Sequence, residues 1–181
     1  DSDLQPTIYE GKLYMIDYHG IKVMTAMGYS SITTLETDHN VDCLIIVDGK
    51  LYSGSTGIIQ IWDCSTDVLI DTLTEHVGPV LCLASQDGKL YAGSTDGTVR
   101  GWNCSDKKLI KTLTGHAYDV QCLLIHDGKL YSGSDDQTIK IWNCSDFSLI
   151  KTLTAHCQRI RSLAIHDGKL YSGSYCIILV H

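Results

Sequence analysis

The chain has 181 residues, a formal net charge of -7 and a mean hydropathy of +0.01. The acidic balance disfavours nucleic acids and anionic membranes as partners, and no apolar run approaches the roughly 18 residues that a membrane-spanning helix needs. The N-terminus, Asp1-Ser2-Asp3, is acidic rather than basic and apolar, so no secretory signal is expected there.

Tryptophan recurs at positions 62, 102 and 142, a spacing of 40 residues each time. The sequence around these positions returns in the order Asp-Gly-Lys-Leu-Tyr-Ser-Gly-Ser, Ile-Lys-Ile-Trp-Asn-Cys-Ser and Leu-Ile-Lys-Thr-Leu-Thr. A period near 40 residues indicates one supersecondary motif copied along the chain. Because no single copy can bury its apolar faces alone, the copies are expected to stack on one another.

Five hairpins are expected along the chain. An Asp-Gly pair between two apolar runs is a strong hairpin signal, and no segment of useful length has helical periodicity. Each pair is followed by one lysine and then by Leu-Tyr, and the pairs stand at 10–11 (a weaker Glu-Gly copy), 48–49, 87–88, 127–128 and 167–168. The chain is therefore predicted to be all-β.

The fourth repeat illustrates the strands expected in each copy. Residues 120–125 are apolar on both faces, which suits a strand that is covered on both sides. A second strand is expected over 130–134, a tight turn over 135–137, and two further strands over 138–142 and 149–153. Four antiparallel strands per 40 residues constitute one blade of a β-propeller.

These residues resemble the WD40 repeat family over nearly the whole chain. The motifs are Gly115-His116 before the first strand, the Tyr-Ser-Gly-Ser segment, an Asp in the following turn and Trp-Asn at the end of the third strand. The resemblance implies a single WD40-type β-propeller domain over 1–181, with about five four-stranded blades, the last one incomplete. The blade limits implied are 4–36, 41–74, 79–114, 119–154 and 159–181.

The resemblance also implies a hydrogen-bonded network of His, Ser, Asp and Trp within each blade. A buried indole N–H needs an acceptor, and such a network stiffens the blade. The residues implied are His39, Ser53 and Trp62 in blade two; His76, Asp96 and Trp102 in blade three; His116, Ser132, Asp136 and Trp142 in blade four; and His156 and Ser172 in blade five. Blade one is degenerate, with Met24 at the Trp position; blade three has Ala92 in place of Ser, and the shorter turn of blade two lacks the Asp.

A hydrolase triad is the alternative interpretation of Ser132, His116 and Asp136. We disfavour it because the same residue types recur in the repeat and no nucleophile elbow surrounds the serine.

The blade count leaves three arrangements open. Propellers have about 4–8 blades, so five blades can be an arc of a longer propeller, a small closed ring, or half of a ring that two chains complete. An open arc exposes the edge of blade five, where the uncharged, β-prone run 176–180 lies. Self-association through blade edges is therefore expected.

The eight cysteines fall mainly on two repeated positions and contain no Cys-x-x-Cys spacing. Neither a zinc site nor a disulfide framework is predicted from this pattern, and no metal or cofactor is expected. Free thiols suit a reducing compartment, so the expected location is intracellular, either cytoplasmic or nuclear.

Candidate binding residues are found where the copies differ. The loops before each first strand and the turns after each second strand are expected on one rim, and loops on a rigid scaffold are common binding sites. Tyr and Arg are enriched at binding hot spots. The candidates for a protein-binding rim are Pro79, Thr95, Tyr118, Asp119, Asp135, Gln158, Arg159 and Arg161.

The main functional expectation is a non-catalytic scaffold that presents this rim to other proteins. The Asp-Gly-Lys-Leu-Tyr-Ser-Gly-Ser segment is similar to propellers of F-box and TRAF-type ubiquitin ligases and of alpha-kinases, which implies a substrate-recruiting module. A structural subunit that contacts its neighbours by open blade edges is a further alternative. An enzyme is disfavoured because the Asp residues lie in repeated turns rather than in one cluster.

Overall fold

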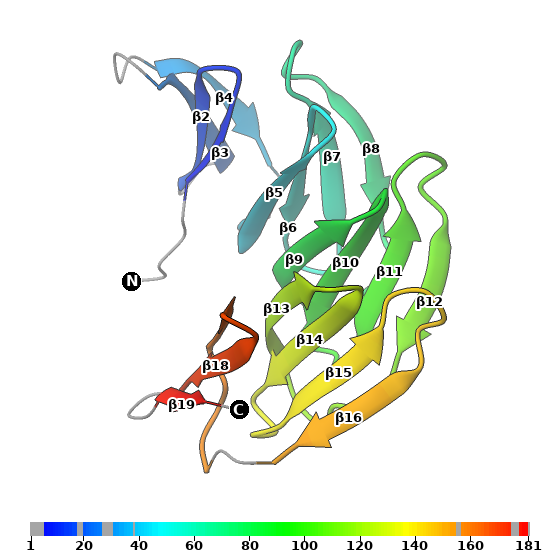
Figure 1. The fold of residues 1–181 in the computed structure, drawn as a ribbon. Helices are drawn as coiled ribbons and strands as arrows, with labels where there is room; N and C mark the ends of the chain where they lie inside the picture. The colour runs from blue at the N-terminus through cyan, green and yellow to red at the C-terminus, as the bar shows by residue number, and fades with distance from the viewer. Residues whose placement is uncertain are drawn as a thin grey trace. The chain divides into compact units, whose positions relative to one another are not determined.

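The computed structural model describes residues 6–17, 20–26, 31–37, 39–154, 157–174 and 178–180. Within this described part the regular structure consists of β-strands in five antiparallel sheets, four with four strands and one with three. No helix among the described residues could cross a membrane. Each sheet is a run of consecutive hairpins, as the labelled strands β13 to β16 illustrate (Figure 1). The all-β prediction and the incomplete fifth sheet are confirmed, and we name the sheets blades one to five in chain order.

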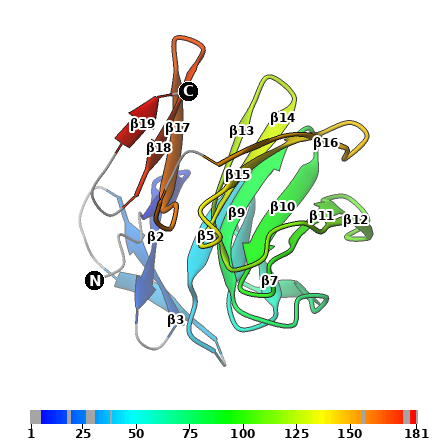
Figure 2. The same ribbon diagram turned by 90° about the horizontal axis from the view of Figure 1, so that it is seen from below.

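The strands of each blade pair in chain order. Blade one contains β1 (Thr7–Tyr9), β2 (Lys12–Asp17), β3 (Gly20–Thr25) and β4 (Ser31–Glu36), and blade two contains β5 (Cys43–Val47), β6 (Lys50–Gly54), β7 (Ile59–Asp63) and β8 (Leu69–Leu73). Blade three contains β9 (Val80–Gln86), β10 (Lys89–Ser94), β11 (Val99–Asn103) and β12 (Leu109–Leu113). Blade four contains β13 (Val120–His126), β14 (Lys129–Ser134), β15 (Ile139–Asn143) and β16 (Leu149–Leu153). Blade five contains β17 (Ser162–His166), β18 (Lys169–Gly173) and β19 (Ile178–Val180), which lie side by side in Figure 2.

The chain forms two compact units, residues 1–80 and residues 81–181, which we call the N-terminal and C-terminal units. The core of the N-terminal unit includes Tyr14, Val23 and Trp62. The core of the C-terminal unit includes Leu130 and Trp142. The single domain over 1–181 and its blade limits remain predictions.

The Asp-Gly pairs form the tight turns that the sequence indicates. Asp127 and Gly128 both have positive φ, 48° and 67°, between β13 and β14. Two central residues with positive φ are typical of the type I′ turn, whose twist matches that of the strands it joins. The equivalent pairs at 10–11, 48–49, 87–88 and 167–168 also have positive φ at both residues. The five predicted hairpins are therefore present.

A glycine and a cysteine allow neighbouring blades to pack closely. A Cβ atom on Gly133 would lie 2.7 Å from both Cys122 Sγ and Ile160 Cγ2, so no larger residue fits there without a shift. Cys82 Sγ donates a weak hydrogen bond to the carbonyl of Val120 at 3.5 Å. Burial raises the pKa of the Cys122 thiol to about 12, so it stays protonated at neutral pH. Cysteines at this repeated position therefore serve packing between blades.

Candidate functional site

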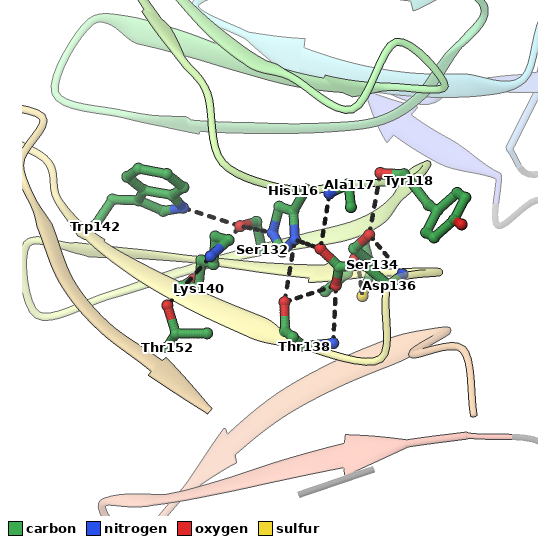
Figure 3. A network of polar contacts seen from close by, with 12 residues as sticks. His116, Ala117, Tyr118, Ser132, Ser134, Asp136, Thr138, Lys140, Trp142 and Thr152 are labelled. Carbon is green, nitrogen blue, oxygen red and sulfur yellow. Dashed lines mark hydrogen bonds and ion pairs between the residues drawn. The ribbon is translucent and has the colours of Figure 1, made fainter. Parts of the chain in front are cut away.

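The four residues of the blade-four network form one chain of hydrogen bonds (Figure 3). Trp142 Nε1 on β15 donates to Ser132 Oγ on β14 at 2.9 Å. Ser132 Oγ lies 2.8 Å from His116 Nε2, and His116 Nδ1 lies 2.7 Å from Asp136 Oδ2. The loop before β13 is thereby connected through the sheet to the indole at the end of β15.

Asp136 fastens the β14–β15 turn to the preceding loop. Its carboxylate accepts hydrogen bonds from Thr138 N at 2.9 Å, from Thr138 Oγ1 at 2.6 Å and from Ala117 N at 3.0 Å. Burial by itself would raise the pKa of Asp136, but the hydrogen bonds from Thr138, His116 and Ala117 hold that pKa below its ordinary value. The carboxylate is therefore ionised at neutral pH and accepts all of these bonds at once.

His116 is neutral at this position. Burial is the largest influence and lowers the pKa of His116 below 6.5, although the carboxylate of Asp136 acts in the opposite direction. A neutral ring with its proton on Nδ1 donates to Asp136 and accepts the hydroxyl proton of Ser132 on Nε2. This tautomer satisfies both ring nitrogens within the blade.

The same distances have the order of a Ser–His–Asp triad, but the serine is not accessible. Ser132 is 0 % exposed, and the His116 side chain is 1 % exposed. Ser132 Oγ is also occupied by the N–H of Trp142. A substrate would have to open the blade to reach this hydroxyl, so the geometry fits a structural network.

Blade two retains part of the network. Trp62 Nε1 donates to Ser53 Oγ at 3.0 Å, and both side chains are buried. His39, however, is exposed rather than buried. The blade-two turn at Thr56-Gly57 has no Asp that could hold the imidazole as Asp136 holds His116, which accounts for the difference.

The turn aspartate of blade three forms an ion pair with an arginine of its own blade. Asp96 accepts hydrogen bonds from Thr98 N and Thr98 Oγ1, and it forms a 2.6 Å ion pair with Arg100 Nη1. Trp102 and Asp96 belong to the C-terminal unit, whereas the buried His76 belongs to the N-terminal unit.

In blade five, Ser172 is buried. His156 lies outside the described residues, as does His181, which the sequence alignment of repeats places at the Trp position.

Backbone contacts join the variable loops of the C-terminal unit. A Cβ on Gly97 would lie 3.1 Å from the carbonyl oxygen of His116, so this turn is in contact with the next loop. Asp135 N donates to Asp119 O at 2.9 Å, and Ile160 N donates to Ser134 O at 3.1 Å. Residues 95–97, 116–119, 135–137 and 157–161 therefore form one continuous surface, which we call the C-terminal rim.

The C-terminal rim carries an exposed aromatic ring and an ion pair. Tyr118 is 64 % exposed, while its carbonyl accepts a hydrogen bond from Ser134 Oγ at 3.1 Å. Arg159 Nη1 lies 3.1 Å from Asp135 Oδ2, and Asp135 Oδ1 is buried without a hydrogen-bond partner among the described residues. A depression of about 300 Å³ at this point is lined by Asp135, Gln137, Cys157, Gln158 and Arg159.

Not all sequence-predicted rim residues lie in this depression. Thr95 and Asp119 are half-buried in the same rim, and Arg161 is exposed beyond it. Pro79 is half-buried in the N-terminal unit, where it forms a β-bridge with Thr56. Gln137 lines the depression although it was not a candidate. The sequence could have indicated it, because the equivalent turn position in blade three is Gly97 and both residues have positive φ, so a long side chain at 137 is a difference between the copies. No group of three or more His, Cys, Asp or Glu suitable for a metal ion occurs among the described residues.

Comparison with known proteins identifies the repeat. A family model described as "WD domain, G-beta repeat" (WD40) matches residues 67–103 and 107–143. The fold is that of a WD40-type β-propeller. Both matched segments end at Trp-Asn, so one sequence repeat begins near the outer strand of a blade and ends in the third strand of the next.

Solved structures with this fold include natural and designed proteins. The computationally designed Ika8 protein is 22 % identical with a TM-score of 0.88, over 97 % of this chain and 56 % of that one. A chain in a crystal structure of the mitotic checkpoint complex is 24 % identical with a TM-score of 0.82, over 90 % of this chain and 53 % of that one. The designed Ika4 protein is 25 % identical with a TM-score of 0.75, over 80 % of this chain and 92 % of that one.

The chain thus spans about half the length of the first two of these structures. No curated protein matches the sequence. WD40 repeats typically mediate protein–protein interactions, and propellers of this type are generally non-enzymatic scaffolds.

Proposed function

We propose that the protein is a non-catalytic interaction scaffold and that its C-terminal rim binds another protein. The observation that carries this proposal is the exposed ring of Tyr118 on a backbone that is fixed on both sides by hydrogen bonds. A large side chain with few rotatable bonds loses little conformational entropy on binding, which is one reason why Tyr is enriched at binding sites.

The ion pair of Arg159 and Asp135 gives the rim a polar recognition element beside this ring. The guanidinium of Arg159 is more than half exposed, whereas the Asp135 carboxylate is almost covered. A partner can therefore reach Arg159 directly, while Asp135 orients it from below. This arrangement supports a partner surface that offers a carboxylate or carbonyl oxygen to Arg159 and an apolar group to Tyr118.

Quantitative affinity capture tests the proposal. We expect Tyr118→Ala and Arg159→Ala to lose at least one protein that the parent chain captures from a lysate. Lys111→Ala on β12 is the matched control, because it removes an exposed side chain of the same unit outside the rim. A set of captured proteins that is the same for parent, rim variants and control would contradict the proposal.

A narrower function is that of a substrate-recruiting module in a ubiquitin ligase or kinase complex. Support comes from the exposure of Arg159 and Arg161, which are two positions apart in the sequence, since an arginine can bind phosphate bidentately. A phosphorylated partner would have to compete with Asp135 for Arg159. A phosphorylated form of a captured segment should therefore bind more tightly than its unmodified form; equal affinities would remove this narrower proposal.

We also propose an intracellular location. Seven cysteines among the described residues are free thiols, and Cys64 and Cys144 are buried. Buried thiols are compatible with a reducing compartment. Fluorescence imaging of the tagged full chain would test this, and accumulation in the secretory pathway would contradict it.

A further inference from the structure

The outermost strands of blades two and three have the same sequence except for a charge at their centre. β8 reads Leu-Ile-Asp-Thr-Leu, and β12 reads Leu-Ile-Lys-Thr-Leu. Asp71 at the centre of β8 pairs with Ile61, and Lys111 at the centre of β12 pairs with Gly101, the equivalent residue of blade three. The two strands therefore place opposite charges at one register position.

Each of these strands forms the margin of its own sheet (Figure 1). The strand orders are β5-β6-β7-β8 and β12-β11-β10-β9, so within the described part of the chain neither strand has a sheet neighbour on its outer side. Leu69 and Ile70 are 42 % and 40 % exposed, and Leu109 and Ile110 are 39 % and 41 % exposed. An edge strand with exposed apolar side chains is a template for pairing with a strand of another chain.

The segments that contain these outer strands also differ in net charge. Residues 63–75 carry a formal charge of -4 and residues 103–115 a formal charge of +2, while residues 143–155 of blade four are neutral. The charged residues are Asp63, Asp67, Asp71 and Glu75 in the first segment, Asp106, Lys107, Lys108 and Lys111 in the second, and Asp146 and Lys151 in the third. Blade two therefore has an acidic outer edge, and blade three has a basic one.

Antiparallel pairing of β8 with β12 of a second copy brings these opposite charges together. In the register that places Asp71 across from Lys111, Leu69 lies across from Leu113 and Leu73 lies across from Leu109, because the two strands have the same order of residues. Opposite charges directly across an antiparallel pair stabilise it, and like charges destabilise it. Pairing of β8 with β8, or of β12 with β12, is disfavoured because it places like charges across from each other.

The outer strand of blade four is a weaker match for β8. β16 has the same sequence as β12, with Lys151 at the position of Lys111. Two residues beyond the strand, however, the same register brings Glu75 to Lys107 in blade three and to Phe147 in blade four. Pairing with β12 thus combines two pairs of opposite charges, whereas pairing with β16 has one.

We propose that the protein self-associates by edge-to-edge pairing of β8 in one copy with β12 in a second copy. The contact is heterologous, because the two copies contribute different strands, so it builds chains or closed rings of copies. Both strands lie inside the chain, so this contact differs from the blade-five edge at 176–180 that the sequence predicted. The inference does not depend on the proposed function, since neither strand carries a residue of the C-terminal rim.

Sedimentation equilibrium of the full chain measures the association. The weight-average mass should rise with protein concentration. Raising the ionic strength from about 0.01 M to about 1 M should lower this mass, because salt screens exposed charges. A chain that stays monomeric over the whole concentration range at low ionic strength would overturn the proposal.

Charge reversal locates the contact. Asp71→Lys and Lys111→Asp should each weaken association about tenfold, because each places like charges across from one another. An equimolar mixture of these two variants should associate again, since each supplies the edge that the other needs, and the double variant should associate like the parent. Lys151→Asp on β16 is the matched control and should leave the association unchanged.

Circular dichroism of each variant identifies a change that merely disturbs folding. Because Lys111 is exposed, Lys111→Asp and Lys151→Asp decide the question even if Asp71→Lys does not fold. Association that Lys111→Asp does not weaken, or that Lys151→Asp weakens equally, would refute the pairing of β8 with β12. A mixture of folded Asp71→Lys and Lys111→Asp that remains monomeric would refute it as well.

Discussion

Blades three and four have the same strand register, but their side chains make different contacts at equivalent positions. Ala92 and Ser132 occupy the same place on the second strand, opposite Arg100 and Lys140. In blade four Ser132 links the Trp indole to His116, while in blade three Arg100 forms the ion pair with the turn aspartate. Both Trp residues are nevertheless buried. The comparison indicates that burial of the indole and attachment of the turn are separate tasks within a blade.

Loss of the indole should have the largest effect. Trp142→Ala removes a 4 % exposed side chain from the core of the C-terminal unit and should lower the free energy of unfolding by about 3–5 kcal/mol. Urea unfolding followed by circular dichroism measures this loss. If burial dominates, Trp102→Ala costs a similar amount. A loss several times larger in blade four would show that the network carries most of the stability.

The two blades also differ at the residue opposite the tyrosine of the second strand, which is Gly101 in blade three and Ile141 in blade four. A substitution can introduce the blade-four residue into blade three. Gly101→Ile should destabilise the chain by about 1–3 kcal/mol, because the new side chain meets the rings of Phe147 and Tyr91. Phe147→Asp in the same chain should recover part of this loss, because it removes one of the two rings that the new side chain meets. A double-mutant cycle measures the coupling, and additive effects would show that the two positions do not interact.

The network serine should have a smaller effect. Ser132→Ala turns blade four into a copy of blade three at this position and should cost about 1 kcal/mol, because Trp142 Nε1 loses its acceptor. Ala92→Ser places a hydroxyl at the same register beside Trp102 and should stabilise the chain by less than this amount. Paired unfolding curves of the two variants test the prediction. If Ser132→Ala leaves the free energy of unfolding unchanged, the network only positions the loop before β13 and does not stabilise the chain.

Most of the fold could be predicted because it follows from local sequence patterns that recur in each copy of the repeat. Asp127-Gly128 between two apolar runs strongly favours a turn with two positive φ values, and the structure has that turn. The strands of blade four were predicted within one residue at most ends. The contacts of His116 with Ser132 and Asp136 also agree with the motif that implies them.

The rest could not be predicted because the repeat motif does not determine which partner each side chain contacts. The exposure of His39 was not predicted, although the sequence shows that the blade-two turn lacks the aspartate that could hold the imidazole. The ion pair of Arg100 with Asp96 was not predicted, because the motif does not require an arginine at position 100. The contacts of Lys12 with the carbonyl of Cys64 and of Lys89 with the carbonyl of Cys144 were missed because they join residues more than fifty positions apart in the sequence.

The pH dependence of stability should show the smallest effect. It distinguishes a turn that is anchored by hydrogen bonds to a neutral His116 from a turn that is anchored by an ion pair. His116 has a folded pKa below 6.5, so the unfolded chain binds its proton more readily than the folded chain. Stability from this group is present above the unfolded pKa and is lost as the pH falls through the folded pKa. Asp136, whose pKa is also lowered, contributes stability that is lost only at still lower pH, below its ordinary 3.8.

Urea unfolding at about pH 7.5 and pH 5.5 measures the histidine step separately. The parent chain should lose more stability between these values than His116→Asn, whose starting stability is lower. His126→Asn, an exposed histidine of the same blade, is the matched control and should retain the parent's slope. Equal slopes in the parent and His116→Asn would mean that the imidazole is not held neutral by its burial. In that case blade four would anchor its turn by an ion pair between His116 and Asp136, as blade three does with Arg100 and Asp96.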